Sequence, residues 1–367
     1  MKPVIALLGR PDTPSDGVQD YCEFLGRALE SHGTELTITR FDWFQDGWIR
    51  ALAKLRQAAR QWRGKWVILQ YTALAWSRHG FPVGLLLVLA VLRHSGARCA
   101  IVYHEPYRQE GSGRLRGSCQ GYVIRKMYHH AHKAIFPDPL ETIGWLPKNE
   151  TKAAFIPIGA NVTTNIARAA NPRNDGSVKT IALFCLSRPP NASIEIEDIS
   201  HAARSAAEKS PRLRFVFFGR GTSEAKEEIQ SAFRAIPVEI SFLGLIQSNE
   251  IGRVLAQSDV MLCVRGAITP RRGSAIAGIA FGLPIVAYQG VGTGFPITEA
   301  GLELVTYRDK QALGRALCNV IADERLRQDL GRRSRRAHED YFSWEKIAER
   351  FVKELSPIER CSHHPRR

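Results

Sequence analysis

Residues 265–288 read RGAITPRRGSAIAGIAFGLPIVAY, and this stretch decides the fold class. It follows an apolar run at 259–264 (DVMLCV) and contains a second one at 283–287 (LPIVA), both typical of buried strands. Between the runs, a loop leads into a short segment of small residues, 274–281, which favours a helix. Strand, loop, helix and strand predict a βαβ unit and therefore a parallel sheet.

The loop of this unit carries residues that suit an anion. Parallel sheets place ligand sites at the carboxyl ends of their strands, where this loop is expected to lie. Arg271 and Arg272 supply two fixed positive charges, and Gly273 lets the backbone approach a ligand closely. Ser274 is expected to be the N-cap of the helix. A helix N-terminus beside guanidinium groups suits a diphosphate, and the alternative is a solvated basic loop beside a buried helix.

Length and composition indicate a globular protein with an anionic partner. The chain has 367 residues, enough for two domains, of which 44% are hydrophobic and 24% charged. A net charge of +15 points to nucleic acid, an anionic membrane or a polyanionic substrate. The seven cysteines are scattered and form no CxxC pair, which favours a reducing compartment.

No secretory signal or membrane span is expected. Arg10, Pro11 and Asp12 follow the first apolar run too soon for an export signal. The strongest apolar run, at 81–92, is twelve residues long. A bilayer span needs roughly seventeen or more, so this run predicts a buried helix.

Strands and helices alternate along most of the chain, which predicts two Rossmann-like, doubly wound α/β domains. A polar segment at 161–177 is expected to link them, and a helical tail is expected at 309–355. The first loop lacks GxGxxG, which argues against dinucleotide binding there. Strands are expected at 4–8, 35–41, 66–70, 98–103, 134–136, 180–186, 213–218, 238–243, 260–264 and 283–287, and helices at 18–31, 48–62, 81–94, 117–132, 195–208 and 223–234.

The two halves and the C-terminal helix together resemble the GT-B glycosyltransferases, and specifically glycosyltransferase family 4. The resemblance spans nearly the whole chain, and its strength lies in the shared order of short motifs. These motifs are 17–33 (GVQDYCEFLGRALESHG), His104-Glu105, 156–161 (IPIGAN), 242–246 (FLGLI), 255–260 (LAQSDV), 282–287 (GLPIVA) and 342–345 (FSWE).

The resemblance implies a GT-B fold with two domains facing a cleft. Residues 1–164 would form the acceptor domain, residues 165–340 would form the nucleotide-sugar domain, and residues 341–367 would return to the first domain as a helix. It implies a retaining transferase that needs no metal or cofactor and uses a UDP or GDP sugar as substrate. The site residues it implies are His104, Arg188 and Arg272 for catalysis, and Gly17, Gly219, Gly244, Leu245, Arg271, Gly273 and Ser274 for donor binding.

The chain departs from the family pattern at three positions. The family's two glutamates, eight positions apart, are replaced by Thr269 and Ala277, and a family lysine is replaced by Ser193. A minority of similar enzymes have an R-R-G-S loop like residues 271–274. The alternative reading is therefore a catalytically silent GT-B protein that binds a nucleotide, a glycan or a partner protein.

Residues 50–65 contain six basic side chains and no acidic one, interleaved with Leu52, Leu55 and Trp62. Such a segment predicts either a helix lying on an anionic membrane or a solvated helix that packs its apolar stripe inward. The first reading implies a cytoplasmic protein, peripheral on the inner face of the membrane, that acts on a glycan or a lipid-linked acceptor. No motif for nucleic acid accompanies the charge. His129 and His132 would share a helix face, but no nearby carboxylate or cysteine completes a metal site.

Overall fold

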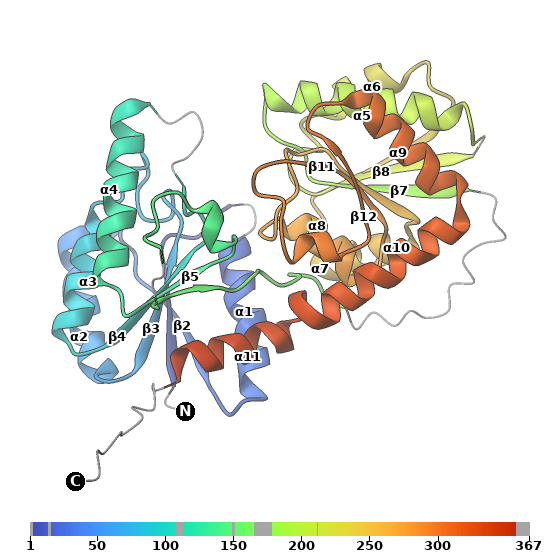
Figure 1. Cartoon of the computed structure of the whole chain (residues 1–367). Coiled ribbons are helices and arrows are strands. Elements are labelled where there is room, and N and C mark those ends of the chain that lie inside the picture. The colour runs from blue at the N-terminus through green and yellow to red at the C-terminus, as the bar shows by residue number, and fades with distance from the viewer. Residues whose placement is uncertain are drawn as a thin grey trace, which may run out of the picture. The chain divides into compact units, whose positions relative to one another are not determined.

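The computed structural model describes residues 3–13, 16–107, 113–148, 151–164, 178–210 and 212–356. The chain forms two compact units (Figure 1). Unit 1 comprises Met1–Phe136, Trp145–Ile156 and Ile347–Arg367, and unit 2 comprises Pro137–Gly144 and Pro157–Lys346. Most of the predicted linker, from residue 165 onward, lies outside the described residues.

Unit 1 is built on one parallel sheet with the strand order β2-β1-β3-β4-β5-β6. Helices α1 and α11 lie on one side of it, and α2, α3 and α4 form a layer on the other (Figure 1). The strands are β1 (Val4–Leu8), β2 (Leu36–Arg40), β3 (Trp66–Tyr71), β4 (Arg98–Tyr103), β5 (Lys133–Phe136) and β6 (Ala153–Phe155). The helices are α1 (Gly17–Glu30), α2 (Trp48–Ala59), α3 (Gly84–His94), α4 (Arg114–His130) and α11 (Trp344–Leu355).

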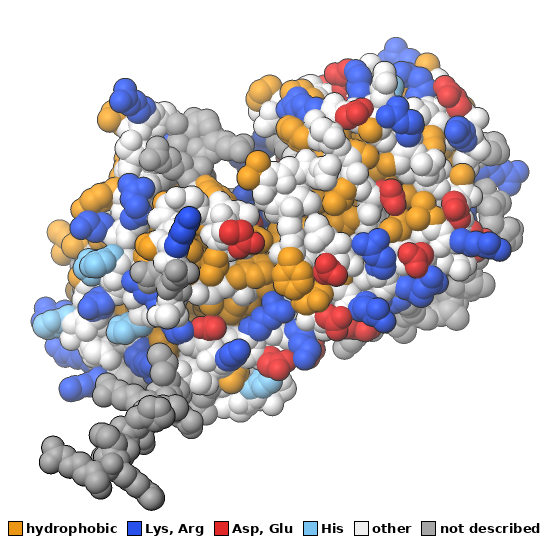
Figure 2. All heavy atoms as spheres, in the orientation of Figure 1, with side chains coloured by type: hydrophobic (Ala, Val, Ile, Leu, Met, Phe, Trp, Pro, Cys, Tyr) orange, Lys and Arg blue, Asp and Glu red, His pale blue; other side chains and the backbone are white. Residues whose placement is uncertain are grey.

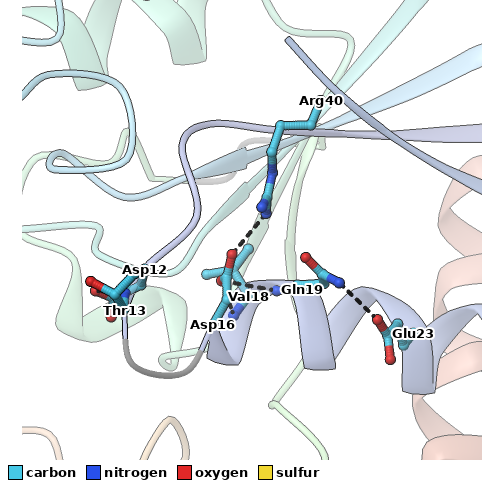
Figure 3. Close-up of polar contacts among 7 residues, drawn as sticks. All are labelled: Asp12, Thr13, Asp16, Val18, Gln19, Glu23 and Arg40. Carbon is cyan, nitrogen blue, oxygen red and sulfur yellow. Dashed lines mark hydrogen bonds and ion pairs between the residues drawn. The ribbon is translucent and has the colours of Figure 1, made fainter. Parts of the chain in front are cut away.

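The central strands of unit 1 are covered on both faces. Every residue of β1 and of β3 is buried, which explains why both strands read as continuous apolar runs rather than alternating ones. At the start of α1, one carboxylate oxygen of Asp16 accepts hydrogen bonds from the amides of Val18 and Gln19 (Figure 3). Its other oxygen binds Arg40 Nη2 at 2.7 Å, so the helix start is fixed to the end of β2.

Unit 2 is a second parallel sheet, with the strand order β12-β11-β10-β7-β8-β9. The order reverses between β7 and β10, which makes that pair the topological switch point of the sheet. The strands are β7 (Lys179–Phe184), β8 (Leu213–Phe218), β9 (Glu239–Gly244), β10 (Val260–Cys263), β11 (Ile285–Gln289) and β12 (Leu302–Thr306). The helices are α5 (Asn191–Ala207), α6 (Lys226–Phe233), α7 (Ser248–Gln257), α8 (Gly273–Ala280), α9 (Lys310–Ala322) and α10 (Glu324–Ala337).

The βαβ unit predicted at residues 259–287 is present as β10, α8 and β11. The sheet has an apolar core on each face, one against α5, α6 and α9 and the other against α7 and α8. Helix α8 is almost entirely buried, which explains its small, apolar residues.

The predicted helical tail is not continuous. Asp323 ends α9 and caps α10 by accepting a hydrogen bond from the amide of Leu326. A π-helical turn, His338–Phe342, then separates α10 from α11. The sequence reading also missed two short strands, β6 and β12, because neither has a long apolar run.

Helix α2 packs its apolar stripe inward. Leu55 is fully buried and Trp62, in the turn that follows α2, is 8% exposed. The outward residues of α2 are mainly basic or polar, including Arg50, Lys54 and Arg56. Leu55 and Trp62 of residues 50–65 therefore contribute to the core. Among the described residues, no helix is both long enough and apolar enough to cross a bilayer.

Candidate functional site

The candidate site of unit 2 lies at the carboxyl ends of β7 and β10, which is the switch point of the sheet. A small pocket of about 10 Å³ lies between the two strand ends, with residues of the following loops in its wall. Its lining includes Cys185, Leu186, Cys263, Arg265, Arg272 and Ser274. A larger, open hollow of about 880 Å³ lies at the turn between α9 and α10, away from these strand ends.

Residues 265–273, here called the arginine loop, connect β10 to α8 and bring Arg265, Arg271 and Arg272 together. Arg272 is half-buried, and its Nη2 lies 3.5 Å from the carbonyl oxygen of Ala267. Burial lowers the pKa of Arg272, and the nearby charges of Arg265 and Arg271 lower it further. The loop therefore holds positive charges close enough to repel one another, a state that an anion would stabilise.

The start of α8 differs from the prediction. The N-cap is Arg272, whose carbonyl accepts from the amide of Ile276 at 3.0 Å, and Ser274 lies inside the first turn. No side chain caps this helix. The prediction was wrong because Arg272 N already bonds to Thr269 O, and the N-cap lies two residues closer to the N-terminus than predicted. The amides of the first turn thus have no side-chain acceptor, and they lie next to the guanidinium groups.

Two buried carboxylates support the loop, and the sequence reading found neither. Asp138, 3% exposed at its side chain, pairs with Arg271 through Oδ2 and Nε at 3.1 Å. Burial raises the pKa of Asp138, against the opposing effect of Arg271 and Arg272. Glu195 of α5 accepts from the amide of Ser187 at 2.8 Å, and burial raises its pKa as well. A carboxylate two residues after the strand at 134–136 was the one signal available for Asp138.

Two of the predicted donor-binding glycines are required by the fold itself. Gly219 has φ +87°, and a Cβ there would lie 2.7 Å from Cys185 Sγ. Its amide donates to the carbonyl of Gly244 at 2.7 Å. Gly244 has φ +62°, and a Cβ there would lie 2.7 Å from Ser223 Oγ. Both glycines hold loops around the switch point in place, so a ligand is not needed to explain them.

Gly17 and Gly273 have no such explanation. Each is the first residue of a helix, α1 and α8 respectively, and neither has a positive φ. A Cβ on Gly17 would have no atom within 4 Å, and one on Gly273 would make an ordinary 3.7 Å contact with Ile158. Backbone conformation and packing therefore do not require glycine at these two positions. Space for a ligand next to the backbone would explain it.

The remaining predicted residues of unit 2 lie at the same edge of its sheet. Arg188 is exposed on the loop between β7 and α5. Leu245, 50% exposed, directly follows β9. The structure thus brings the arginine loop, the β7–α5 loop and the ends of β8 and β9 to one edge of unit 2, while Gly17 and His104 belong to unit 1.

His104 follows β4 in unit 1 and is held by neutral partners. Its Nε2 lies 2.7 Å from Gln70 Oε1, and the ring of Tyr21 meets it edge-on at 5.0 Å between centroids. Burial lowers the pKa of His104 to about 4, so the imidazole is neutral near pH 7. Because Gln70 Oε1 can only accept, Nε2 carries the proton and Nδ1 is the acceptor. Gln70 Nε2 is buried without a hydrogen-bond partner.

The histidines at 129–132 form no metal site. Helix α4 ends at His130, so His132 does not share a helical face with His129 as predicted. His132 Nδ1 instead accepts from the amide of Cys99 at 2.9 Å. Within the described ranges, no group of three or more His, Cys, Asp and Glu side chains could hold a metal ion.

Comparison with known proteins agrees with this arrangement. Residues 182–323, which contain both strands of the switch point and the arginine loop, match the family model described as glycosyl transferases group 1. No curated protein matches the chain.

Three solved structures are similar over nearly the full length. HepE of Anabaena, in complex with UDP and glucose, shares 14% identity at a TM-score of 0.68, covering 97% of this chain and 99% of that one. Sucrose-phosphate synthase of Thermosynechococcus elongatus shares 18% identity at a TM-score of 0.68, with 96% and 98% covered. An E. coli protein named for trehalose-6-phosphate, bound with UDP-2-fluoro glucose, shares 14% identity at a TM-score of 0.64, with 97% and 99% covered.

Identities this low establish the fold alone, and they confirm the predicted fold class. The chain has the GT-B fold of two Rossmann-like domains, and its residues 182–323 match the glycosyl transferases group 1 family.

Proposed function

We propose that the protein is a glycosyltransferase that moves a sugar from a nucleoside-diphosphate donor to a hydroxyl group of a glycan or lipid-linked acceptor. The observation that carries this proposal is the arginine loop: three arginines beside an uncapped helix N-terminus, at the switch point of a parallel sheet. A diphosphate fits such a place because guanidinium groups and backbone amides both donate to its oxygens. The group 1 match over the same residues supports the assignment.

The arginine loop and Arg188 of the β7–α5 loop would act on the leaving group. When the bond from the anomeric carbon to the diphosphate breaks, negative charge builds up on the diphosphate oxygen. Arg188, Arg271 and Arg272 would stabilise that charge, together with the amides that follow Gly273. The oxygen of the acceptor hydroxyl forms the new bond to the anomeric carbon, and its proton passes to the departing diphosphate. Fixed cations at the diphosphate support a reaction without a metal, and the family 4 resemblance supports retention of configuration.

His104 would bind the donor sugar rather than transfer a proton. A neutral imidazole with its proton on Nε2 offers Nδ1 as an acceptor to a sugar hydroxyl. In this proposal the part built from residues 1–164 receives the acceptor and residues 165–340 hold the donor. The UDP complexes of HepE and the E. coli protein favour UDP over GDP.

A catalytically silent GT-B protein is the second candidate, and one observation favours it. Ala277, a residue of α8, is 1% exposed, and Thr269 is half-buried beside Gly292. Neither position of the family's paired glutamates can therefore supply a carboxylate. Turnover of a UDP sugar separates the two candidates, because a silent protein would bind the UDP sugar without releasing UDP from it.

Isothermal titration with UDP tests the site directly. Arg272→Ala should weaken UDP binding roughly ten- to hundredfold, since a charge-assisted hydrogen bond contributes about 1.5–3 kcal/mol. Arg272→Lys should restore only part of the affinity, because an ammonium group cannot bind two oxygens in one plane. The melting temperature of Arg272→Ala should not fall, because removing Arg272 relieves its repulsion by Arg265 and Arg271.

The matched control is Arg315→Ala, an exposed arginine of α9 on the same unit. It should leave UDP affinity unchanged. Equal UDP affinity in wild type and Arg272→Ala would remove the arginine loop from the site and leave the proposal without its main support.

A bacterial-type role in polysaccharide or glycolipid synthesis completes the proposal. The protein would be cytoplasmic and peripheral on the inner face of the membrane, where lipid-linked acceptors are available. The positive net charge of +15 supports an anionic surface as a partner.

A further inference from the structure

The two helix layers of unit 1 carry different charges. The layer of α2, α3 and α4 contains no Asp or Glu: it has three Lys or Arg residues in α2, one in α3 and four in α4. On the opposite side of the sheet, α1 has three acidic residues and one basic one, and α11 has three of each. Among the described helices of unit 1, acidic residues therefore occur in α1 and α11 and not in α2, α3 or α4. The two groups of helices lie on opposite sides of the sheet (Figure 1).

The same layer exposes large apolar side chains. Val83 and Leu87 are 54% and 55% exposed and are one helical turn apart, so they lie on one face of α3. Leu115 and Tyr122, two turns apart on α4, are 83% and 51% exposed. Phe81, just before α3, is 44% exposed. These five residues, Phe81, Val83, Leu87, Leu115 and Tyr122, are named the α3–α4 patch.

The patch is bordered by cations on packed helices. Helix α3 contacts both α2 and α4, so their outward faces are neighbours. Exposed Arg93 lies on α3, and exposed Arg114, Arg125 and Lys126 lie on α4. Figure 2 shows apolar and basic side chains side by side over this part of unit 1. In α2 the charge of Lys54 is partly neutralised by an ion pair with Asp46, so α4 supplies the larger share of the uncompensated charge.

A second copy of the chain, a nucleic acid and a lipid bilayer would each use different side chains of this surface. A second copy of the chain would bring an equally basic face into contact with this one, and the like charges would repel. Nucleic acid would use the cations but would gain nothing from exposed Leu87 and Leu115. An anionic bilayer uses both, because its headgroups attract the cations while its outer acyl region accepts the aliphatic side chains.

We infer that the α3–α4 patch seats the protein on an anionic lipid surface, with the basic residues of α4 and α3 at the headgroups. This inference deepens the proposed function, since it places the protein where a lipid-linked acceptor lies. It also replaces residues 50–65 as the membrane-contacting apolar surface, because Leu55 and Trp62 of that segment are buried.

Vesicle sedimentation of the full chain tests the inference, with phosphatidylcholine vesicles compared with vesicles that also contain phosphatidylglycerol. The wild-type protein should sediment with the anionic vesicles and should be released by salt. Leu87→Ser and Leu115→Ser should each weaken binding by about tenfold, since each removes an aliphatic side chain that the bilayer would bury. Arg125→Gln and Lys126→Gln should each weaken it by about fivefold.

The controls lie away from the patch. Arg27→Gln changes an exposed arginine of α1 on the opposite side of the sheet, and Tyr307→Ser removes an aromatic residue of unit 2 that is 46% exposed. Both should bind vesicles as the wild type does. All patch variants should keep the wild-type melting temperature, because the substituted side chains are exposed.

Three results would overturn the inference: equal binding to neutral and anionic vesicles, vesicle binding that the two leucine substitutions leave unchanged, or retention on RNA in preference to anionic vesicles. The UDP titration of the same variants keeps the two proposals apart. If the wild type fails to bind vesicles but binds UDP, only the membrane inference is contradicted. If Arg272→Ala loses UDP affinity but binds vesicles normally, the membrane inference stands.

Discussion

The two units of this protein share one backbone plan and differ in the charge at the ends of their strands. Both are parallel sheets whose strand order reverses once, between β1 and β3 in unit 1 and between β7 and β10 in unit 2. In unit 2 this edge holds Arg265, Arg271 and Arg272, which repel one another. In unit 1 the corresponding edge holds neutral, hydrogen-bonded His104 and Gln70.

This difference shows which part of a ligand each edge can accept. The geometry of the parallel sheet decides where a ligand can lie, because loops and helix N-termini collect at the carboxyl ends of the strands. The side chains decide its chemistry. Arginines that repel one another in unit 2 suit phosphate oxygens, whereas a neutral imidazole in unit 1 suits hydroxyl groups. In unit 1, Arg40 is already paired with Asp16 at the start of α1 (Figure 3).

Glycine substitutions should sharpen this comparison most. Gly221 has φ +82°, and a Cβ there would lie 2.5 Å from the carbonyl oxygen of Leu186. Gly221→Ala should therefore destabilise the protein by roughly 3 kcal/mol. Gly273→Ala should keep or slightly raise the stability, because the first turn of α8 accepts alanine. It should nevertheless lower UDP affinity by about tenfold, as the methyl group would occupy the ligand's place.

Gly17→Ala is the matched variant in unit 1. It should also keep its melting temperature, but its effect on UDP affinity should be smaller because the arginine loop belongs to unit 2. Thermal melts and UDP titrations of all three variants measure this order. A larger loss of UDP affinity in Gly17→Ala than in Gly273→Ala would reverse the assignment of the diphosphate to unit 2.

The neutrality of His104 predicts a pH dependence of stability. Its pKa in the folded protein is about 4, below the usual value of 6.5. As pH falls from 6.5 toward 4, the unfolded chain therefore binds the proton first, and folding stability is lost. Between pH 7 and pH 5, wild type should lose roughly 2 kcal/mol more than His104→Gln, which has no group to titrate at this position.

Urea unfolding at the two pH values measures this difference, and the other titrating groups cancel because both proteins contain them. Parallel stability curves for wild type and His104→Gln would mean that His104 is protonated normally in the folded protein. Burial would then not keep His104 neutral below pH 6.5, and the comparison between the units would lose that support.

Chelation should have the smallest effect. If arginines neutralise the diphosphate in unit 2, exhaustive EDTA treatment should leave UDP-sugar turnover and UDP affinity unchanged. Turnover assays before and after chelation, with magnesium and manganese added back, decide this. A requirement for either ion would mean that the arginine loop does not balance the diphosphate charge by itself.

Particular residues show how far the sequence could be read. The apolar runs around residues 265–288 predicted β10, α8 and β11, because buried strands and small-residue helices leave a local pattern. Ser274 was wrong as a cap, because a hydrogen bond between Arg272 and Thr269 sets the helix start. His132 was wrong as a helical neighbour of His129, because α4 ends two residues earlier.

The sequence by itself determined the alternation of strands and helices, the two parallel sheets and the position of the arginine loop, all of which follow from local periodicity. Only the tertiary structure decided which side of α2 faces the core, that Asp138 pairs with Arg271, and that Gly273 is free of any demand from the fold. These features depend on contacts between residues far apart in the chain. Periodicity shows that a helix has an apolar stripe. Packing partners decide which other apolar residues stay exposed, as those of the α3–α4 patch do.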